Sequence, residues 1–216
     1  WFRNRVSEHI PEEFGKSLAD TLAKALKFHG IINIVPTKLY NGSQTGDWNS
    51  LGVDFTILGL YETTAGSLKL ELRLFDISSD KMILGKSYSG KRTQLNEMLY
   101  RFCDSVIKDL TGSTGLGDTQ IAFVSQGSDS KKKELFVTDI LGSKLRQVTR
   151  HRNLVVSPRF IPNSSFITYT SYHSGNQNLY ITDLRQNRIT RVLSRRDGMN
   201  LAPGWFPDGD SMLLTL

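Results

Sequence analysis

Apolar and polar residues alternate without a break from Leu68 to Leu74 within the apolar-rich segment Leu68–Phe75. Strict alternation of this kind predicts a strand with one buried face and one face in water. Apolar runs at residues 31–35, 53–60 and 82–88 predict three further strands, the last of which returns through a turn at residues 76–81. The first half of the chain therefore contains enough strands for a small sheet.

Two segments place apolar residues at helical spacing. The first begins at Pro11, because proline suits the first helical turn and the two glutamates after it suit the positive end of the helix dipole; it ends before Gly30. The second carries one apolar stripe from Leu95 to Leu110 and ends at Gly112. Together with the strands, these helices predict a compact α/β domain over residues 1–114, with its helices on one face of a sheet.

The second half of the chain repeats itself. The segment that starts at Pro158 matches the one that starts at Pro203, with Phe160 aligned on Trp205. Two further pairs recur at nearly the same spacing: Leu135–Asp139 with Leu179–Asp183, and Ile121–Ser125 with Ile167–Ser171. The spacing is about 45 residues, which is the length of one four-stranded blade of a β-propeller.

Residues 118–216 are therefore expected to form about two blades and the start of a third. This is a partial β-propeller, because a closed propeller needs about four to eight blades. The glycine-rich segment Gly112–Gly117 lies between the two parts. It follows a helix and precedes a strand, the reverse of the order in phosphate-binding loops, so it is interpreted as a linker. The expected fold class is thus a small α/β domain followed by all-β blades.

The charge of the chain is uneven. The net charge is +6, and lysine plus arginine outnumber aspartate plus glutamate by 13 to 8 in residues 118–216, against 14 to 13 in residues 1–117. A basic half favours a polyanion as partner. These basic residues are spread through turns and inter-repeat loops, however, without an RNA-binding motif, so no nucleic-acid partner is expected. No apolar run reaches the length that a membrane-spanning helix needs.

The sequence shows no catalytic or metal-binding set. Cys103 lies inside the apolar stripe of the second helix, which indicates a small core residue. Asp139 and Asp183 stand just before turns and are expected to accept backbone hydrogen bonds there. No metal-ligand spacing links the four histidines, which are His9, His29, His151 and His173. His29 ends a helix and is expected to cap it. We therefore expect no enzyme activity, no cofactor and no metal.

The candidate functional site is a protein-binding surface formed by loops. In a blade, the loop that joins two repeats and the loop between the second and third strands emerge on the same face. Here these loops are residues 150–154, 172–176 and 195–200, and their composition suits contact with a protein. The candidate partner-binding residues are His151, Arg152, Asn153, Tyr172, His173, Arg195, Arg196, Met199 and Asn200.

The repeated segments also carry a family resemblance. Ser157-Pro-Arg-Phe-Ile-Pro-Asn-Ser164, Ala202-Pro-Gly-Trp-Phe-Pro-Asp-Gly209 and the recurring Leu-(Phe/Tyr)-(Val/Ile)-Thr-Asp resemble the blades of the TolB family, propeller proteins of the Tol–Pal envelope system. The first domain, with Leu74-Phe-Asp-Ile77 and Met82-Ile-Leu-Gly-Lys86, and the junction Asp118-Thr-Gln-Ile-Ala-Phe-Val124 are similar to the same family. The resemblance covers almost the whole chain.

The resemblance implies about six blades, a periplasmic location and a non-enzymatic scaffold that maintains outer-membrane integrity. Its partners would be TolA and the peptidoglycan-associated lipoprotein Pal, with Pal at the loops named above. Residues 1–10 show neither a strand before the first helix nor the extended segment with which the family engages TolA. The alternative is the propeller of a prolyl-oligopeptidase-type serine peptidase whose hydrolase domain lies beyond Leu216.

Overall fold

The structure is a computed structural model, which describes residues 2–4, 12–39, 48–126, 132–186, 190–201 and 204–215. Contacts between residues divide the chain into two units, Trp1–Thr119 and Gln120–Leu216. We call them the N-terminal unit and the repeat unit. Pro11 and Pro203, which the sequence patterns use, lie outside the described residues. Neither helix in the described part of the chain is long and apolar enough to cross a membrane.

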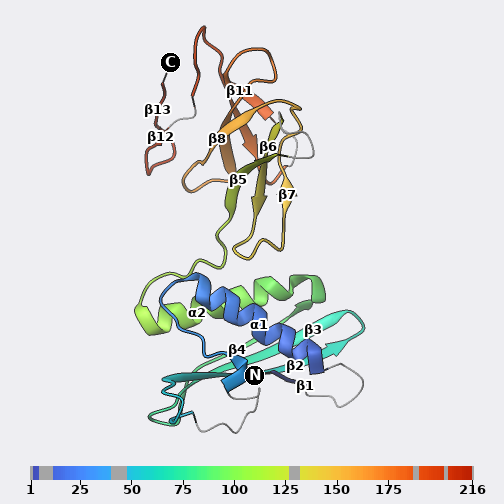
Figure 1. Ribbon diagram of the computed structural model, residues 1–216, viewed down its shortest axis with the longest axis vertical. Coiled ribbons are helices and arrows are strands. Elements are labelled where there is room, and N and C mark those ends of the chain that lie inside the picture. Colours follow the sequence, from blue (N-terminus) through green and yellow to red (C-terminus); the bar gives the residue numbers. More distant parts are fainter. Residues whose placement is uncertain are drawn as a thin grey trace. The chain divides into compact units, whose positions relative to one another are not determined.

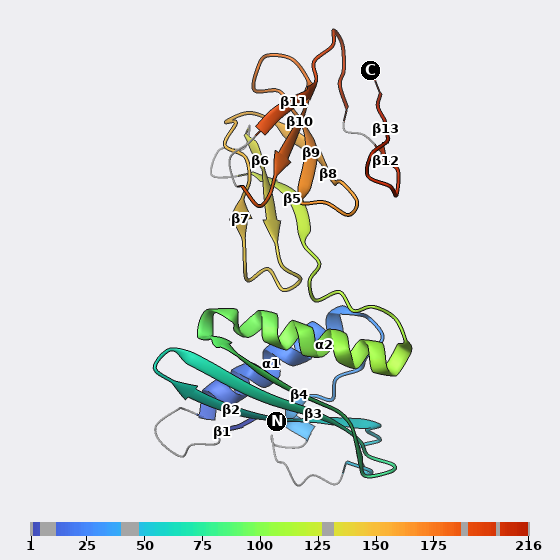
Figure 2. The same cartoon turned by 180° about the vertical axis from the view of Figure 1, so that it is seen from behind.

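The N-terminal unit is a four-stranded sheet with two helices on one face (Figures 1 and 2). The strand order is β1-β2-β3-β4; β1 is parallel to β2, and the other neighbours are antiparallel. Its strands are β1 (Phe2–Asn4), β2 (Phe55–Thr64), β3 (Ser67–Asp76) and β4 (Lys81–Lys91), and its helices are α1 (Glu12–Phe28) and α2 (Leu95–Thr111), with 3-10 turns η1 (Thr37–Leu39) and η2 (Arg92–Gln94). This confirms the expected α/β fold.

The core of this unit follows from the alternation on β3. Leu68, Leu70, Leu72 and Leu74 are at most 1% exposed, whereas Lys69 and Arg73 between them are exposed. The buried face meets the apolar stripes of the helices, formed by Leu18, Leu22, Ala25, Leu26, Leu99, Phe102, Cys103, Val106 and Ile107. Cys103 is a core residue, as predicted, and its burial raises the pKa of its thiol. Gly112 ends α2 in the left-handed conformation (φ 74°).

Two expectations for this unit are wrong. Residues 1–10 do contain a strand, because β1 pairs in parallel with Gly59–Tyr61. Ile31–Val35 forms no strand, and Ile31 and Ile34 are exposed. β1 occupies the edge of the sheet beside β2, and residues 31–35 do not belong to the sheet. A cavity of about 600 Å³ opens beside the unpaired segment, with a lining that is largely apolar and includes Leu22, Leu26, Val53, Ile57, Val106 and Leu110.

The repeat unit is built of antiparallel sheets. One is a complete four-stranded meander in the order β11-β10-β9-β8, from β8 (Val155–Phe160), β9 (Phe166–Ser171), β10 (Asn178–Asp183) and β11 (Thr190–Ser194). The preceding sheet has three strands, β5 (Ile121–Gln126), β6 (Lys133–Thr138) and β7 (Arg146–Gln147), and the last has two, β12 (Gly204–Trp205) and β13 (Met212–Leu213). These sheets confirm the expected blades.

The repeat is visible in the strand register. Phe160 pairs with Ile167, and Trp205, 45 residues after Phe160, pairs with Met212. The turns between these strands close with equivalent hydrogen bonds, Ile161 N–H to the Phe166 carbonyl (3.0 Å) and Phe206 N–H to the Ser211 carbonyl (3.0 Å). Within the described residues, the two repeated segments thus have the same strand pairing and the same bond closing the turn.

Buried residues join the sheets of the repeat unit to one another. Leu135 of β6 lies in one apolar cluster with Val155, Ile167, Tyr169 and Tyr180, which come from β8, β9 and β10. The third repeat is linked to the second by the indole of Trp205, whose Nε1–H donates to Thr168 Oγ1 at 3.1 Å. Packing of successive sheets through their faces is what a propeller requires.

The turn aspartates act as predicted. Asp139 Oδ1 accepts the Ser143 N–H at 2.7 Å, and its other oxygen accepts the Ser143 hydroxyl. Asp183 Oδ1 accepts the Arg185 N–H at 2.9 Å and the Ser165 hydroxyl at 2.7 Å. These bonds, the backbone bond from Arg185 first, hold the pKa of Asp183 below its ordinary value. Both carboxylates therefore stabilise turns by accepting hydrogen bonds, which is a structural role.

Candidate functional site

Three loops of the repeat unit lie side by side at one end of the strands. They are residues 150–154 before β8, residues 172–177 between β9 and β10, and residues 195–200 after β11. One backbone bond joins the first loop to the second, from Tyr172 N–H to the Leu154 carbonyl (3.0 Å), and another joins the second to the third, from Asn200 N–H to the Gln177 carbonyl (3.2 Å). We call this surface the loop face.

Side-chain amides join the same loops a second time. Asn153 Nδ2 donates to the Tyr172 carbonyl at 3.1 Å, and Asn176 Nδ2 donates to the Arg196 carbonyl at 3.3 Å. The structure therefore brings all nine candidate residues into one connected group of loops. Their roles within it differ, however, because burial divides them into side chains that face solvent and side chains that hold the loops in place.

Arg152, Arg195 and Arg196 are exposed on the loop face, with the acidic Asp197 beside the last two. His173 is also exposed, and Met199 is 51% exposed. Arg152 adopts a left-handed backbone conformation (φ 56°), which is unusual for a residue with a side chain. Arginine and methionine are enriched in protein interfaces, where arginine forms bidentate bonds with carboxylates and methionine adapts its shape. This surface suits a protein that presents acidic side chains beside apolar ones.

Two histidines and two tyrosines form a ring cluster under the loop face. The ring centroids of His151 and His173 are 4.1 Å apart, and both Nδ1 atoms lie within hydrogen-bond distance of Ser171 Oγ (2.7 and 3.3 Å). The His151 ring also packs edge-on against Tyr169 and Tyr180, whose rings are stacked at 5.9 Å. The sequence does not predict this contact between His151 and His173, because the two residues are 22 positions apart and only the fold of the sheet brings their rings together.

The cluster does not form a hydrolytic site. Ser171 lies within hydrogen-bond distance of a histidine, as a nucleophile would, but its side chain belongs to a residue with 0% exposure. A substrate carbonyl cannot reach a buried hydroxyl, and geometry is the first requirement for a nucleophile and its base. Among the described residues, no group of three histidine, cysteine, aspartate or glutamate side chains is placed to hold a metal ion.

Glu134 of β6 holds the first loop and was not singled out from the sequence. It is 8% exposed, and its carboxylate accepts the N–H of His151 (3.1 Å), the N–H of Arg152 (2.6 Å) and the hydroxyl of Thr149. Thr149 Oγ1 in turn accepts the Leu135 N–H at 2.9 Å. A buried charge needs donors of this kind, and the same bonds keep Arg152 in its left-handed conformation. In the sequence, Glu134 is indistinguishable from the solvated residues of a lysine-rich hairpin.

Asn200 holds the third loop. It is 0% exposed, and its Oδ1 accepts the Ser194 hydroxyl (2.7 Å) and the Arg196 N–H (3.1 Å), while its Nδ2 donates to the carbonyls of Gln177 (3.0 Å) and Arg196 (2.8 Å). An asparagine amide has four hydrogen-bonding positions, and all four are used here. Asn200 therefore supports the loop face from below and does not present its own side chain to a partner.

The half-buried position of His151 predicts a dependence of stability on pH. Burial first, and the neighbouring His173 second, lower the pKa of His151 from 6.5 to about 4, with Glu134 opposing the shift. Between these values the unfolded chain binds more protons than the folded chain, so the free energy of unfolding falls as the pH is lowered from 6.5 towards 4. We expect a loss of about 1–2 kcal/mol, after a discount for the partial exposure of the ring.

Urea unfolding of wild type and of His151→Gln at about pH 7.5 and about pH 4.5 measures this effect, because the difference between the two proteins cancels the titration of other groups. The His173→Gln variant tests the second cause of the shift: without the neighbouring His173 ring, the loss of stability on acidification should become smaller but should not disappear. An equal loss of stability on acidification in wild type and His151→Gln would contradict the prediction.

Comparisons with known proteins agree on one family. A family model described as TolB beta propeller domain matches residues 107–216. The Tol-Pal system protein TolB of Desulfotalea psychrophila is 55% identical to this chain over 216 residues, and the match covers 100% of this chain and 49% of the relative. The Tol-Pal system protein TolB of Desulfosudis oleivorans is 35% identical over 212 residues, and the match covers 93% of this chain and 48% of the relative. The chain spans about half the length of these curated relatives. The crystal structure of TolB from Acinetobacter baumannii has a similar fold, with a TM-score of 0.80 at 23% identity over 99% of this chain and 52% of that one.

Proposed function

The chain belongs to the TolB family, and from this membership we propose that it is part of a non-enzymatic periplasmic scaffold of the Tol–Pal system whose loop face binds Pal. The observation that carries the proposal is the loop face itself. Three loops are joined by backbone and amide bonds, held from below by Glu134 and Asn200, and expose Arg152, Arg195 and Met199 to solvent.

The preorganisation of these loops supports a binding role. Association costs less free energy when the contacting loops are already ordered, because little conformational entropy is lost on binding. The exposed arginines favour a partner with carboxylates at the matching positions, and arginine is a common hot-spot residue. TolA is a second partner in this proposal, although no described residue of this chain marks its site. Membership of this family argues against the alternative of a peptidase propeller.

Replacement of both Arg152 and Arg195 by alanine in the full-length protein is expected to weaken Pal binding about tenfold for each arginine and about a hundredfold together. Calorimetric titration of the purified protein with the soluble domain of Pal from the same organism measures the affinity. Thermal stability should stay unchanged, because both side chains are exposed. Binding should also weaken as salt is added, since the proposed contacts are between arginines and carboxylates.

Arg185→Ala is the matched control. Arg185 is an exposed arginine that follows β10, at the end of the strand opposite the loop between β9 and β10. The Arg185→Ala substitution removes one positive charge from the repeat unit but leaves the loop face unchanged. Unchanged Pal binding in the double variant, or an equal loss in the Arg185 variant, would disprove the assignment of this face; a melting temperature that falls with the affinity would do the same.

A further inference from the structure

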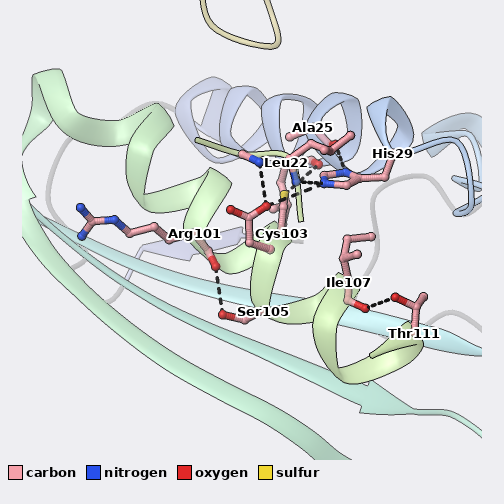
Figure 3. A network of polar contacts seen from close by, with 11 residues as sticks. Leu22, Ala25, His29, Arg101, Cys103, Ser105, Ile107 and Thr111 are labelled. Atoms are coloured by element: carbon pink, nitrogen blue, oxygen red, sulfur yellow. Dashed lines mark hydrogen bonds and ion pairs between the residues drawn. The ribbon is translucent and has the colours of Figure 1, made fainter. Parts of the chain in front are cut away.

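His29 and Asp104 attach the start of the segment between the two units to the helix pair of the N-terminal unit. Figure 3 shows His29 and its hydrogen bond to the Ala25 carbonyl. The His29 side chain is 3% exposed, and both of its ring nitrogens have partners. Nδ1 lies 2.9 Å from the Ala25 carbonyl, and Nε2 lies 2.9 Å from the Leu116 backbone nitrogen. Because a carbonyl only accepts and an N–H only donates, Nδ1 carries the proton and Nε2 is an acceptor. The arrangement therefore requires a neutral imidazole.

The residues that His29 holds lie closely against α2. The Gly117 N–H donates to Asp104 Oδ1 at 2.7 Å. A Cβ atom added at Gly115 would stand 2.0 Å from Asp104 Oδ1 and 2.5 Å from Asp104 Cα, and one at Gly117 would stand 2.8 Å from Tyr100 Cβ and 2.9 Å from the Tyr100 carbonyl oxygen. Only glycine allows this approach. Residues 115–117 are therefore attached to the helix, although their composition suggests a flexible linker.

Protonation of His29 would change these bonds in a defined way. A proton from solvent would add to the Nε2 lone pair, which leaves the Leu116 N–H facing a second donor. Asp104 Oδ1 lies 3.7 Å from Nε2 and can accept the new N–H. The Phe28 ring on α1 lies edge-on to the His29 ring at 6.5 Å and carries no charge. Asp104 is thus the one charged group recorded beside the ring among the described residues.

We propose that His29 and Asp104 form a proton-sensitive clamp on residues 115–117, in which the neutral imidazole holds the Leu116 amide and the imidazolium releases it to pair with Asp104. When the clamp is closed, residues 115–117 are attached to the helix pair twice, at Leu116 through His29 and at Gly117 through Asp104. When His29 is protonated, the bond at Leu116 is lost and only the Gly117 bond to Asp104 remains. Acidification therefore weakens the attachment of residues 115–117 to the helix pair. This inference does not depend on the loop face.

Amide hydrogen exchange, followed residue by residue by NMR on the full-length protein, tests the clamp at pH values on either side of the range in which histidine changes charge. At about pH 8 we expect the Leu116 and Gly117 amides to be protected; at about pH 5 the protection factor of Leu116 should fall about tenfold, which is the loss of one hydrogen bond, while Gly117 keeps most of its protection. Rapid exchange of Leu116 at the higher pH would overturn the proposal.

Three variants sharpen the test. His29→Gln cannot be protonated, so the dependence of Leu116 protection on pH should disappear; if it persists, the proposal is wrong. Asp104→Asn keeps an acceptor for Gly117 but not the anion, so release of Leu116 should move to lower pH. His173→Gln, in the other unit, should behave as wild type. If His29→Gln does not fold, the side-chain nitrogen shifts of wild-type His29 decide the matter, because a neutral ring protonated at Nε2 would refute the clamp.

Discussion

Glu134→Ala is expected to lower the free energy of unfolding of the repeat unit by about 3 kcal/mol and to abolish binding at the loop face. The carboxylate accepts the Thr149 hydroxyl and the N–H groups of His151 and Arg152. Its removal would leave these donors without their acceptor in a site where Glu134 itself is only 8% exposed, and each unsatisfied buried donor costs about 1–3 kcal/mol. Arg152 would also lose the bond that holds its left-handed backbone.

Glu134→Gln separates charge from shape. The amide keeps one acceptor for Arg152 but turns an NH2 group towards the remaining donors, so we expect an intermediate loss of about 1–2 kcal/mol. Urea unfolding and titration with Pal measure both effects in the full-length protein. Glu71→Ala in the other unit is a comparison for the loss of a glutamate as such. A Glu134→Ala protein as stable as wild type, or one destabilised no more than Glu134→Gln, would show that these bonds do not carry the loop.

Asn200→Ala is expected to cost about 3 kcal/mol for a similar reason. The substitution removes two acceptor bonds and two donor bonds at a residue with 0% exposure. At about 0.5–1.5 kcal/mol for each net bond, the four together give this magnitude. The loop that carries Arg195 and Met199 would keep only the backbone bond from residue 200 to the Gln177 carbonyl, so binding at the loop face should weaken as well.

Asn176→Ala is the matched control for this prediction. Asn176 is exposed, and its amide makes one bond, to the Arg196 carbonyl at 3.3 Å. It should cost at most about 0.5 kcal/mol in thermal or urea unfolding. Equal destabilisation by the two substitutions would mean that the burial of Asn200 has no energetic consequence, which would contradict the role assigned to it.

The parts of the fold that the sequence predicts are those with a period. The alternation of leucine with charged residues on β3 leaves one arrangement in which Leu68 and Leu74 are both buried, and the structure has it. The spacing of about 45 residues between Phe160 and Trp205 predicts equivalent strand pairs, and both pairs are present. A repeated pattern works because every copy faces the same packing constraint.

The parts of the fold that the sequence does not predict depend on competition between segments for the same position. The apolar run at residues 31–35 has the composition of a strand, but the edge of β2 is taken at Gly59–Tyr61 by the short strand β1, which has no alternating pattern of its own. Local propensity does not tell which of two segments occupies one edge. The turn aspartates were predictable, since their partners lie only a few residues away.

The candidate site divides in the same way. Its loops could be located because blade geometry sends them to one face, whereas the supporting roles of Glu134 and Asn200 depend on burial that no local pattern reveals. Asn200 illustrates the difference, because in the sequence it looks like any polar residue of an exposed loop. Whether the exposed arginines bind a partner stays a prediction for the titrations to decide.

The hydrogen bond from Trp205 to Thr168 allows the third repeat to be followed by tryptophan fluorescence. Trp205 is the sole tryptophan after residue 119, and its indole is partly shielded where it meets the preceding sheet. Departure of β12 from its neighbour would expose the indole to water and move its emission to longer wavelength. The chromophore already present in the chain can thus report, without an added label, whether one blade is seated on the next.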